Sequence, residues 1–283
     1  MAEHDPNAPA LFDVSALAAE SPTSFMDLED PRYAYMFGFL QADGHLAQGA
    51  GQKGKLTVEI NARDIAILRD FQQLTPYYTS ITERTRSTNF AETHHSATWT
   101  LCALDARTTL NQLGLPYGRK SRRITPPRVP FSRPDYLRGV IDADGAVGFT
   151  ADGLPFVSLT TASTAIAVYL CHYTKRALGI QKLPGRNKRD GIYNVMYMRE
   201  AGVALAQHLY TPEALALGRK KAAAAEVARW VRPADMAPAR TQRSWTGLED
   251  SILLDTETDE GAAVALNRTV KSCKIRRWRL RKR

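Results

Sequence analysis

The sequence predicts an α+β protein whose core is a duplicated αββαββα unit, followed by a small all-α module. Three observations support this prediction. The decapeptides YMFGFLQADG (35–44) and YLRGVIDADG (136–145) repeat one pattern, an apolar helical run that ends in Ala-Asp-Gly. The same order of helical and alternating segments follows each copy. The last part of the chain, residues 244–283, contains three short helical signals.

The first domain, residues 31–120, follows an N-terminal extension (1–30) whose Pro, Ala, Ser and acidic residues show no strong period. After the first repeat we predict, in order, a strand-like turn region, an alternating strand, an amphipathic helix, two extended runs and a short closing helix. The corresponding segments are 44–53, KLTVEINA (55–62), a helix from Asp64 whose Ile65, Leu68 and Phe71 share one face, SITERTRS (80–87), SATWTLCAL (96–104) and 105–113.

The second domain, residues 135–230, repeats this order. A connector at 121–134 interleaves four prolines with four arginines, which predicts a stiff basic linker between the halves. Two prolines mark a second linker, 231–243, before the terminal module. The predicted elements of the second domain are the hairpin AVGFTADGLPFVSLTT (146–161) with its turn at Asp152-Gly153, a helix at 163–178, extended runs within 181–198, and a helix at 201–208.

The composition is that of a globular protein with a polyanionic partner. Of the 283 residues, 44% are hydrophobic, which is enough to build two cores, so the chain is not intrinsically disordered. The formal net charge of +9 favours a polyanion, because a basic surface gains affinity when it displaces counterions from phosphates. Charge alone would also suit a membrane surface. The three cysteines are far apart, which argues against a disulfide framework and a Cys-rich zinc site.

No segment of the sequence has the features of a membrane span or an export signal. No apolar stretch approaches the roughly 18 residues that cross a bilayer, and residues 1–10 lack a basic and an apolar region. We therefore expect an intracellular protein that binds no membrane, in the cytoplasm or nucleoid of a bacterial or phage-infected cell.

Each repeat places two small residues four positions apart, Gly38 with Ala42 and Gly139 with Ala143, so on a helix they form one smooth stripe. Two such stripes can pack with almost no side chain between them. The apolar residues on the other faces are expected to enter two separate cores. They are Met36, Phe39, Leu40, Leu137, Val140 and Ile141.

An acid ends each of these predicted helices. Asp43 and Asp144 directly precede Gly44 and Gly145, where a carboxylate opposes the helix dipole. If the two helices lie side by side in parallel, both carboxylates converge, and their repulsion must be offset by protons or by metal. We expect a bound divalent cation.

These repeats resemble the core motif of the LAGLIDADG homing endonucleases, and two copies 101 positions apart are similar to the monomeric, two-motif class of that family. The resemblance implies two four-stranded antiparallel sheets that form a DNA-binding saddle over the duplex, with the motif helices at the interface between the halves. It implies a monomeric endonuclease that hydrolyses one phosphodiester in each strand of a long, specific double-stranded DNA target. Its cofactor would be Mg²⁺, or another divalent cation such as Mn²⁺, because these ions prefer oxygen ligands.

Carried over onto this sequence, the resemblance makes Asp43 and Asp144 the catalytic metal ligands. The backbone carbonyls of Ala42 and Ala143 would help to bind the metal. Each acid would then serve one DNA strand.

Each half ends with a similar segment that contains Gly-Arg-Lys. The two segments are GLPYGRKS (114–121) and LALGRKKA (215–222). The resemblance gives Lys120 and Lys220 a catalytic part, in which they orient the water around the metals. The alternative is that both are solvated helix-end lysines favoured by the helix dipole. The first repeat departs from the family pattern at Gln41, where the second carries Asp142, and this puts local packing in question more than activity.

The resemblance also implies that side chains on the sheets read the DNA sequence. Arg and Lys favour guanine edges, whereas Asn and Gln favour adenine. The candidates in the extended runs are Thr57, Glu59, Asn61, Arg84, Arg86, Gln181, Lys182, Arg186, Asn187, Lys188, Arg189 and Asn194.

The terminal module resembles a Myb-like helix-turn-helix. Nine Lys or Arg residues and no acid lie between Arg268 and Arg283, which suits a recognition helix in a major groove. The alternative, a disordered basic tail, would also bind DNA. The resemblance rests on Trp245, Glu249, Asp250, Leu253, Ala265, Leu266, Arg268, Thr269 and Trp278. The candidate DNA contacts are Arg268, Lys271, Lys274, Arg276, Arg277 and Arg279.

Two other functions fit the same motifs. One is an intron maturase, an RNA-binding splicing helper, and the other is a DNA-binding regulator that has lost cleavage. The presence of both Asp43 and Asp144 speaks against the regulator. A helix-turn-helix suits B-form DNA better than RNA, whose deep major groove excludes a helix, and this favours the endonuclease over the maturase.

Overall fold

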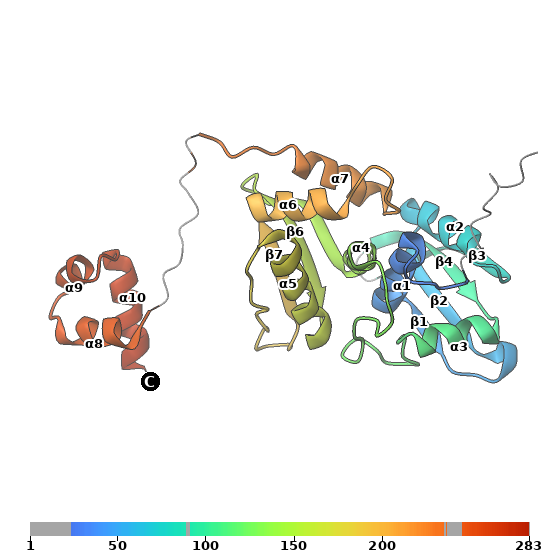
Figure 1. Ribbon diagram of the computed structural model, residues 1–283, viewed down its shortest axis with the longest axis horizontal. Coiled ribbons are helices and arrows are strands. Elements are labelled where there is room, and N and C mark those ends of the chain that lie inside the picture. Colours follow the sequence, from blue (N-terminus) through green and yellow to red (C-terminus); the bar gives the residue numbers. More distant parts are fainter. Residues whose placement is uncertain (1–23, 89–90, 235, 237–244, 283) are drawn as a thin grey trace, which may run out of the picture. The chain divides into compact units, whose positions relative to one another are not determined.

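The computed structural model describes residues 24–88, 91–234, 236 and 245–282. The chain divides into two compact units, the first ending at Arg232 and the second beginning at Pro233. Unit 1 contains two antiparallel sheets with their helices, so the predicted α+β class is confirmed (Figure 1). No helix in these described ranges combines the length and the apolar composition that crossing a membrane requires.

The first half of unit 1 has the predicted αββαββα order. Its four strands pair in the order β1-β2-β4-β3, with every pair antiparallel. The Asp30 carboxylate caps the first helix by accepting a hydrogen bond from the backbone N–H of Arg32 (2.8 Å), and Pro31 follows the cap as the first helical residue. The elements are α1 (Pro31–Asp43), β1 (His45–Ala47), β2 (Lys55–Asn61), α2 (Ile65–Leu74), β3 (Thr79–Thr88), β4 (Ala91–Leu101) and α3 (Leu104–Gln112), with 3-10 turns at Gly51–Lys53 and Ala62–Asp64.

The second half repeats this order with one strand fewer. The strands form a three-stranded antiparallel sheet, β5-β6-β7, and Gly153 has the positive φ (71°) that the predicted Asp152-Gly153 turn requires. The elements are α4 (Arg133–Asp144), β5 (Gly145–Phe149), β6 (Pro155–Thr161), α5 (Thr164–Leu178), β7 (Tyr193–Met198), α6 (Glu200–Leu209) and α7 (Gly218–Ala228).

The prediction of two four-stranded sheets is wrong for this half. The described residues 181–192 form no strand, and only Tyr193–Met198 of the predicted extended runs pairs in the sheet. Pro184 lacks the N–H that a ladder needs, and the Asn187 and Asp190 side chains accept from nearby backbone N–H groups (3.0 Å each), which holds the segment in turns.

Helix α7 was not predicted. Its sequence GRKKAAAAEVA has high helix propensity but only a weak apolar period, which is why a search for amphipathic periodicity overlooks it. The helix contacts α6 and β5, and Ala224 and Val227 are fully buried.

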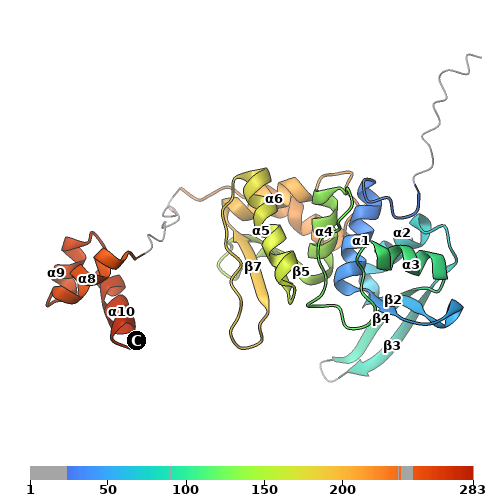
Figure 2. The ribbon, with the colours of Figure 1, turned by 60° about the horizontal axis from the view of Figure 1, so that its bottom comes forward.

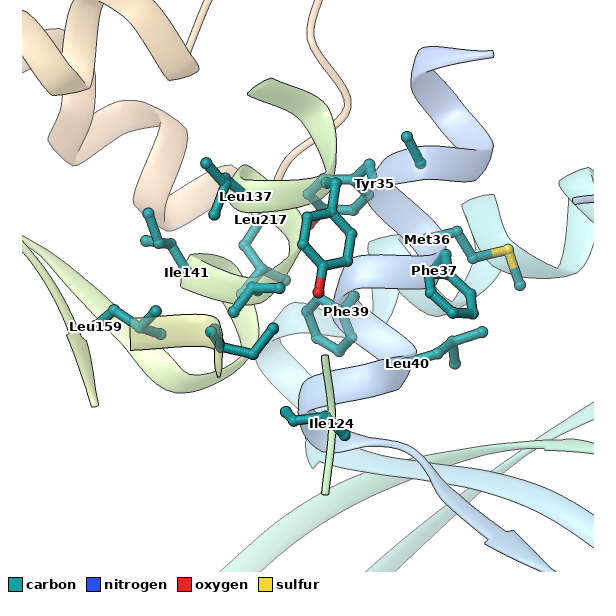
Figure 3. Close-up of a cluster of buried hydrophobic side chains, with 14 of the residues drawn as sticks. Tyr35, Met36, Phe37, Phe39, Leu40, Ile124, Leu137, Ile141, Leu159 and Leu217 are labelled. Atoms are coloured by element: carbon teal, nitrogen blue, oxygen red, sulfur yellow. The ribbon is translucent and has the colours of Figure 1, made fainter. Parts of the chain in front are cut away.

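The two halves share one core. Figures 1 and 2 both show α1 and α4 side by side between the two sheets. Their apolar side chains belong to a single continuous cluster, so the prediction of two separate cores is wrong (Figure 3). The reason is the close approach of the helices, which lets rings such as Phe37 and Tyr136 stack across the seam (centroids 6.4 Å apart).

Unit 2 is a three-helix module made of α8 (Gly247–Asp255), α9 (Asp259–Ala265) and α10 (Val270–Arg281). Thr246 and Glu249 form a capping box at the start of α8. Trp245 packs against a small cluster of Leu253, Ala262, Ala263, Leu266 and Cys273. Trp278, a residue of the predicted Myb-like pattern, is 57% exposed and does not enter this core.

Candidate functional site

The site is positioned by the crossing of α1 and α4. A β-carbon on Gly38 would lie 2.2 Å from the carbonyl oxygen of Tyr136, and one on Gly139 would lie 2.1 Å from that of Tyr35. Only glycine permits backbones to approach so closely, so the predicted stripe of small residues does bring the two helices into direct contact. Because the helices are in contact, their C-terminal ends lie close together.

Asp43 and Asp144, the last residues of the two helices, are close enough for one carboxylate to affect the other. Burial raises the pKa of Asp43 to about 6, and the negative charge of Asp144 adds to this rise. Burial also raises the pKa of Asp144. Both residues are nevertheless exposed at the surface. Among the described residues, neither carboxylate accepts a hydrogen bond or enters an ion pair.

Lys120 and Lys220 approach the two helix ends from opposite halves of the chain. The Lys120 ammonium donates to the carbonyls of Gln41 (2.7 Å) and Ala42. The Lys220 ammonium donates to the carbonyls of Ile141 (2.8 Å), Asp142 (2.7 Å) and Gly145 (2.7 Å). Each amine therefore bonds to carbonyls in the last turn of its helix, such as those of Ala42 and Asp142, which lack a helical partner. The Ile141 carbonyl accepts from the backbone N–H of Gly145 as well.

These lysines are not solvated helix-end residues, because Lys120 is 8% and Lys220 4% exposed. Burial lowers the pKa of Lys120, and it lowers the pKa of Lys220 to about 8. In return, the positive charges of both lysines lower the pKa values of Asp43 and Asp144. The site is thus a group of two acids and two amines whose charges compensate one another. The Ala42 carbonyl, predicted as a metal ligand, already accepts a hydrogen bond from Lys120.

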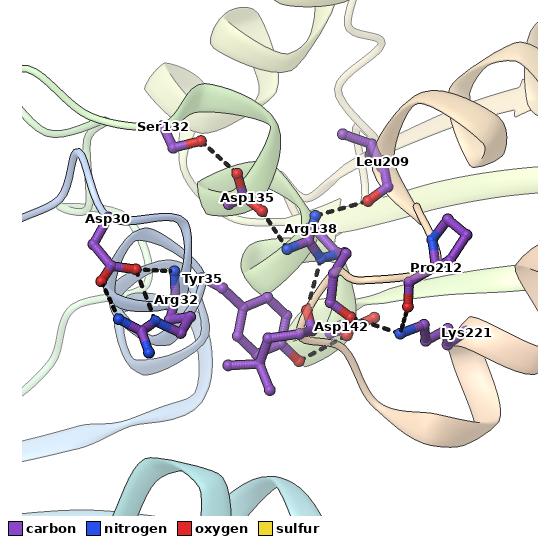
Figure 4. Close-up of polar contacts among 12 residues, drawn as sticks. Asp30, Arg32, Tyr35, Ser132, Asp135, Arg138, Asp142, Leu209, Pro212 and Lys221 are labelled. Carbon is purple, nitrogen blue, oxygen red and sulfur yellow. Dashed lines mark hydrogen bonds and ion pairs between the residues drawn. The ribbon is translucent and has the colours of Figure 1, made fainter. Parts of the chain in front are cut away.

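Two reciprocal hydrogen bonds join α1 and α4 near the group of two acids and two lysines. The Tyr35 hydroxyl of α1 donates to Asp142 of α4 (2.7 Å), and the Tyr136 hydroxyl of α4 donates to Gln41 of α1. Figure 4 shows Tyr35 reaching across to Asp142. The two tyrosines occupy the same position of the two repeats, and the sequence comparison could have found them because each decapeptide begins with Tyr.

The difference between Gln41 and Asp142 is compensated by their surroundings. The Asp142 carboxylate accepts two further hydrogen bonds, from the Tyr210 hydroxyl (2.7 Å) and the backbone N–H of Leu217 (2.7 Å). Gln41 instead donates through its amide to the carbonyls of Gly114 and Thr125 (2.9 Å each). The first half thus supplies acceptors for the Gln41 amide, and the second half supplies donors for the Asp142 carboxylate. The departure from the family pattern at Gln41 therefore does not disturb Asp43 and Asp144.

Removing the Tyr35 hydroxyl is expected to destabilise unit 1 by about 1.5–3 kcal/mol, because it deprives a buried carboxylate of a donor. Tyr136→Phe should cost less, about 0.5–1.5 kcal/mol, because its acceptor is a neutral amide. Urea unfolding of Tyr35→Phe, Tyr136→Phe and the exposed control Tyr78→Phe measures the difference. Equal stability of Tyr35→Phe and Tyr78→Phe would contradict the role of this bond.

One face of the first sheet is polar. Antiparallel pairing through β4 places all the predicted DNA contacts of this half on that face. They are Thr57, Glu59, Asn61, Arg84 and Arg86. The Glu59 carboxylate accepts from Arg86 (2.9 Å) and from the Ser96 hydroxyl (2.7 Å), and its charge adds to the raised pKa of Asp43. This face therefore extends to the neighbourhood of Asp43.

The predicted contacts of the second half are placed differently. Asn194, on β7, pairs with Thr160 and lies on the sheet face opposite to the buried Leu159 and Val195. The remaining candidates lie in the loop 179–192 rather than on a strand, which corrects their predicted placement. They are Gln181, Lys182, Arg186, Asn187, Lys188 and Arg189.

In unit 2, three of the predicted DNA contacts have internal partners. Arg268 pairs with Glu249 (2.9 Å), Arg276 with Asp250, and Arg277 with Asp259 (2.8 Å). These arginines join the three helices to one another, so their first role is structural. The other predicted contacts, Lys271, Lys274 and Arg279, are exposed along α10.

Comparison with known proteins gives matches among solved structures. No model of a known protein family matches the chain, and no curated protein matches it. The homing endonuclease I-WcaI bound to its DNA recognition sequence is 13% identical, over 74% of this chain and 96% of that one, with a TM-score of 0.48. A double mutant of I-SmaMI is 11% identical, over 66% and 86% of the two chains, with a TM-score of 0.43. The N-terminal LAGLIDADG domain of DUF199/WhiA is 9% identical, over 69% and 87%, with a TM-score of 0.43. Likenesses at this level do not bear on the activity of this chain.

Proposed function

We propose that this chain is a monomeric, site-specific endonuclease that hydrolyses double-stranded DNA with the help of a divalent cation. The observation that supports the proposal most directly is the placing of Asp43 and Asp144 at the joined ends of two crossed helices, between two buried lysines. A purely structural helix pair gains nothing from two unpaired acids at this point, because their charges repel each other and oppose the helix dipoles. Perturbed acids of this kind are typical of functional sites.

The residues of this group fit Mg²⁺ or Mn²⁺. In the described part of the chain no cluster of three or more His, Cys, Asp or Glu side chains could hold a metal, which disfavours an all-protein cage. Mg²⁺ is commonly held by one or two carboxylates and keeps several waters. Asp43 and Asp144 would hold it, with the Ala143 carbonyl as a further candidate. When bound, the cation would neutralise charge on the phosphoryl oxygens and make water a better nucleophile.

The chain's own residues would position the DNA and balance charge. The basic side chains of the polar face, among them Arg84 and Arg86, would hold the backbone of one half-site beside Asp43. Lys120 and Lys220 would keep the acids ionised at neutral pH and fix the helix ends from which the acids project. In this proposal each half would supply one acid and one amine for one DNA strand.

The proposal is tested by incubating the purified full chain with a randomised duplex library, first with Mg²⁺ and then with chelator. Specific cut products that depend on the metal are expected. Sequence-specific binding without any cutting would indicate a regulator and would overturn the enzyme, and a preference for structured RNA would indicate a maturase.

For unit 2 we propose a Myb-like helix-turn-helix that binds DNA through α10. Lys271, Lys274 and Arg279 are exposed on this helix, and Trp278 lies beside them with the Lys282 ammonium over its ring (4.3 Å). An exposed helix of this charge can approach phosphates in a major groove. Arg268, Arg276 and Arg277 would support the helix through their ion pairs rather than contact DNA.

Arg84→Gln is expected to weaken DNA binding and to reduce the dependence of the affinity on salt. One lost phosphate contact lowers the slope of log K against log salt by about 0.9. The matched control is Arg69→Gln, because Arg69 is exposed on α2 and not on the polar face. Fluorescence anisotropy with labelled duplex at several salt concentrations measures both slopes. Identical slopes for the two variants would contradict the assignment of the polar face.

Cleavage should have a bell-shaped pH dependence with limbs near pH 6 and pH 8. Below about pH 6 the Asp43 carboxyl is protonated and loses its affinity for cations, so the apparent Mg²⁺ affinity should fall roughly tenfold for each pH unit. Above about pH 8 Lys220 loses its proton and its positive charge, so the cleavage rate should fall again. Initial rates from pH 5 to 9 measure both limbs. A flat acidic limb would show that Asp43 takes no part.

A further inference from the structure

A cavity of about 720 Å³ lies in unit 1, away from the acids and from the polar sheet face. One wall comes from α5, with Val168, Tyr169, His172 and Arg176. The connector and the start of α4 supply Pro126 and Arg133. The volume is in the range of sites that hold small molecules, about 300–1,000 Å³.

The aromatic wall of this cavity is held rigidly. The Tyr169 ring packs against Phe131 (centroids 6.1 Å), Tyr136 (6.3 Å) and Tyr173 (6.5 Å). The Tyr173 hydroxyl is in turn bonded to His208 (2.6 Å). Since Tyr136 belongs to the core, the wall is anchored to the centre of the molecule. A planar apolar body could stack here without reorganising the protein.

The charged groups of the cavity are all basic. No acid lines it, and Arg133 and Arg176 enter no ion pair with any residue of the described ranges. The nearby acid Asp135 is engaged by Arg138 and by the Ser132 hydroxyl. The buried Tyr169 hydroxyl also has no hydrogen-bond partner among these residues, which is unusual for a polar atom out of contact with water.

We propose that this cavity binds a small molecule with a planar apolar body and one anionic group, either a carboxylate or a phosphate. The tyrosine wall would hold the body, and the two guanidinium groups would hold the anion. Guanidinium groups suit both anions because their donors match two oxygens at once. The site is independent of the proposed cleavage activity, because no residue of the acid and lysine group lines it.

The test is equilibrium dialysis of the full chain with two anionic probes, adenosine 5′-monophosphate and 1-naphthoate, and with their neutral counterparts, adenosine and 1-naphthol. At least one anion is expected to bind at a single site, at least roughly tenfold more tightly than its neutral counterpart, because a charge-assisted hydrogen bond is added. Comparison of the two anions shows whether the site prefers phosphate or carboxylate.

Three variants locate the binding. Arg176→Gln should weaken it roughly tenfold, and Val168→Trp should block it by filling the cavity from a side chain that is 38% exposed. Lys175→Gln, next to Arg176 on α5 but outside the cavity, is the matched control and should leave it unchanged. Arg84→Gln should also leave the binding of the probe unchanged, because Arg84 lies on the polar face of the first sheet. Failure of both anions to bind, equal binding of the neutral probes, or equal losses in Arg176→Gln and Lys175→Gln would each overturn the proposal.

Discussion

Alanine at Gly38 or Gly139 is expected to prevent unit 1 from folding stably. The added methyl group would lie just over 2 Å from a carbonyl oxygen of the other helix, and backbone cannot move aside as a side chain does. Overpacking of side chains costs about 1–3 kcal/mol, so a backbone clash at the centre of the shared core should exceed about 3 kcal/mol. That is a large part of the 5–15 kcal/mol that stabilises a typical domain. Urea unfolding followed by circular dichroism measures the loss.

Gly218→Ala is the matched control for this experiment. Gly218 also lies in a helix, but nothing is within 4 Å of the position where its β-carbon would stand. Alanine there should be neutral or should stabilise the protein by about 0.4–1 kcal/mol, because it restricts the unfolded chain. If Gly38→Ala were as stable as Gly218→Ala, the helices could not cross as described.

Replacing Asp43 or Asp144 by asparagine is expected to abolish double-strand cleavage. Each single variant should leave at most a nick in one strand, with the rate of linearisation reduced by more than roughly a thousandfold, because one carboxylate of the proposed cation site is lost. A supercoiled plasmid that carries a sequence selected as cut from the randomised library distinguishes supercoiled, nicked and linear products in one assay. DNA affinity without metal should change little. Double-strand cutting by both single variants would refute the assignment of the acids.

The substitution Asp43→Asn should also make the folded protein more stable at neutral pH. The pKa of Asp43 in the folded protein is about 6, above its ordinary value of 3.8, so ionisation favours the unfolded chain. The gain from Asp43→Asn should therefore be absent below about pH 4, grow between pH 4 and 6, and stay constant above. We expect about 1 kcal/mol, because the partly exposed carboxylate is screened by solvent. Asp152→Asn, in an exposed hairpin turn, should show neither the loss of cleavage nor this gain.

Repetition within the sequence predicted the centre of the fold well. The spacing of Gly38 with Ala42, and of Gly139 with Ala143, predicted the contact between the helices. The place of Asp43 and Asp144 at the two helix ends predicted that the acids would lie near each other if the helices were parallel. These predictions succeed because a helix converts a fixed spacing in sequence into a fixed geometry in space. Lys120 and Lys220 could be predicted because the tripeptide Gly-Arg-Lys occurs at the corresponding place in each half.

The parts that could not be predicted depend on contacts between distant segments. The bonds from Tyr35 to Asp142 and from Tyr136 to Gln41 join residues about a hundred positions apart, and a local pattern contains no information on such partners. The internal ion pairs of unit 2 are of the same kind, because an arginine that pairs with an acid of another helix looks the same in sequence as one that binds phosphate. The fourth strand of the second half was expected from the repeated order of elements and from the family resemblance, but local turns at Asn187 and Asp190, after Pro184, take its place.

The continuous core has a consequence for engineering this chain. Neither half can be expected to persist alone, because separating the halves would expose the glycines at the helix contact and the rings stacked over them. Attempts to recombine halves from different chains should therefore exchange α1 and α4 together, with the residues at Gln41 and Asp142 matched to their tyrosines. The smallest portion that can be exchanged is the helix pair, not the repeat.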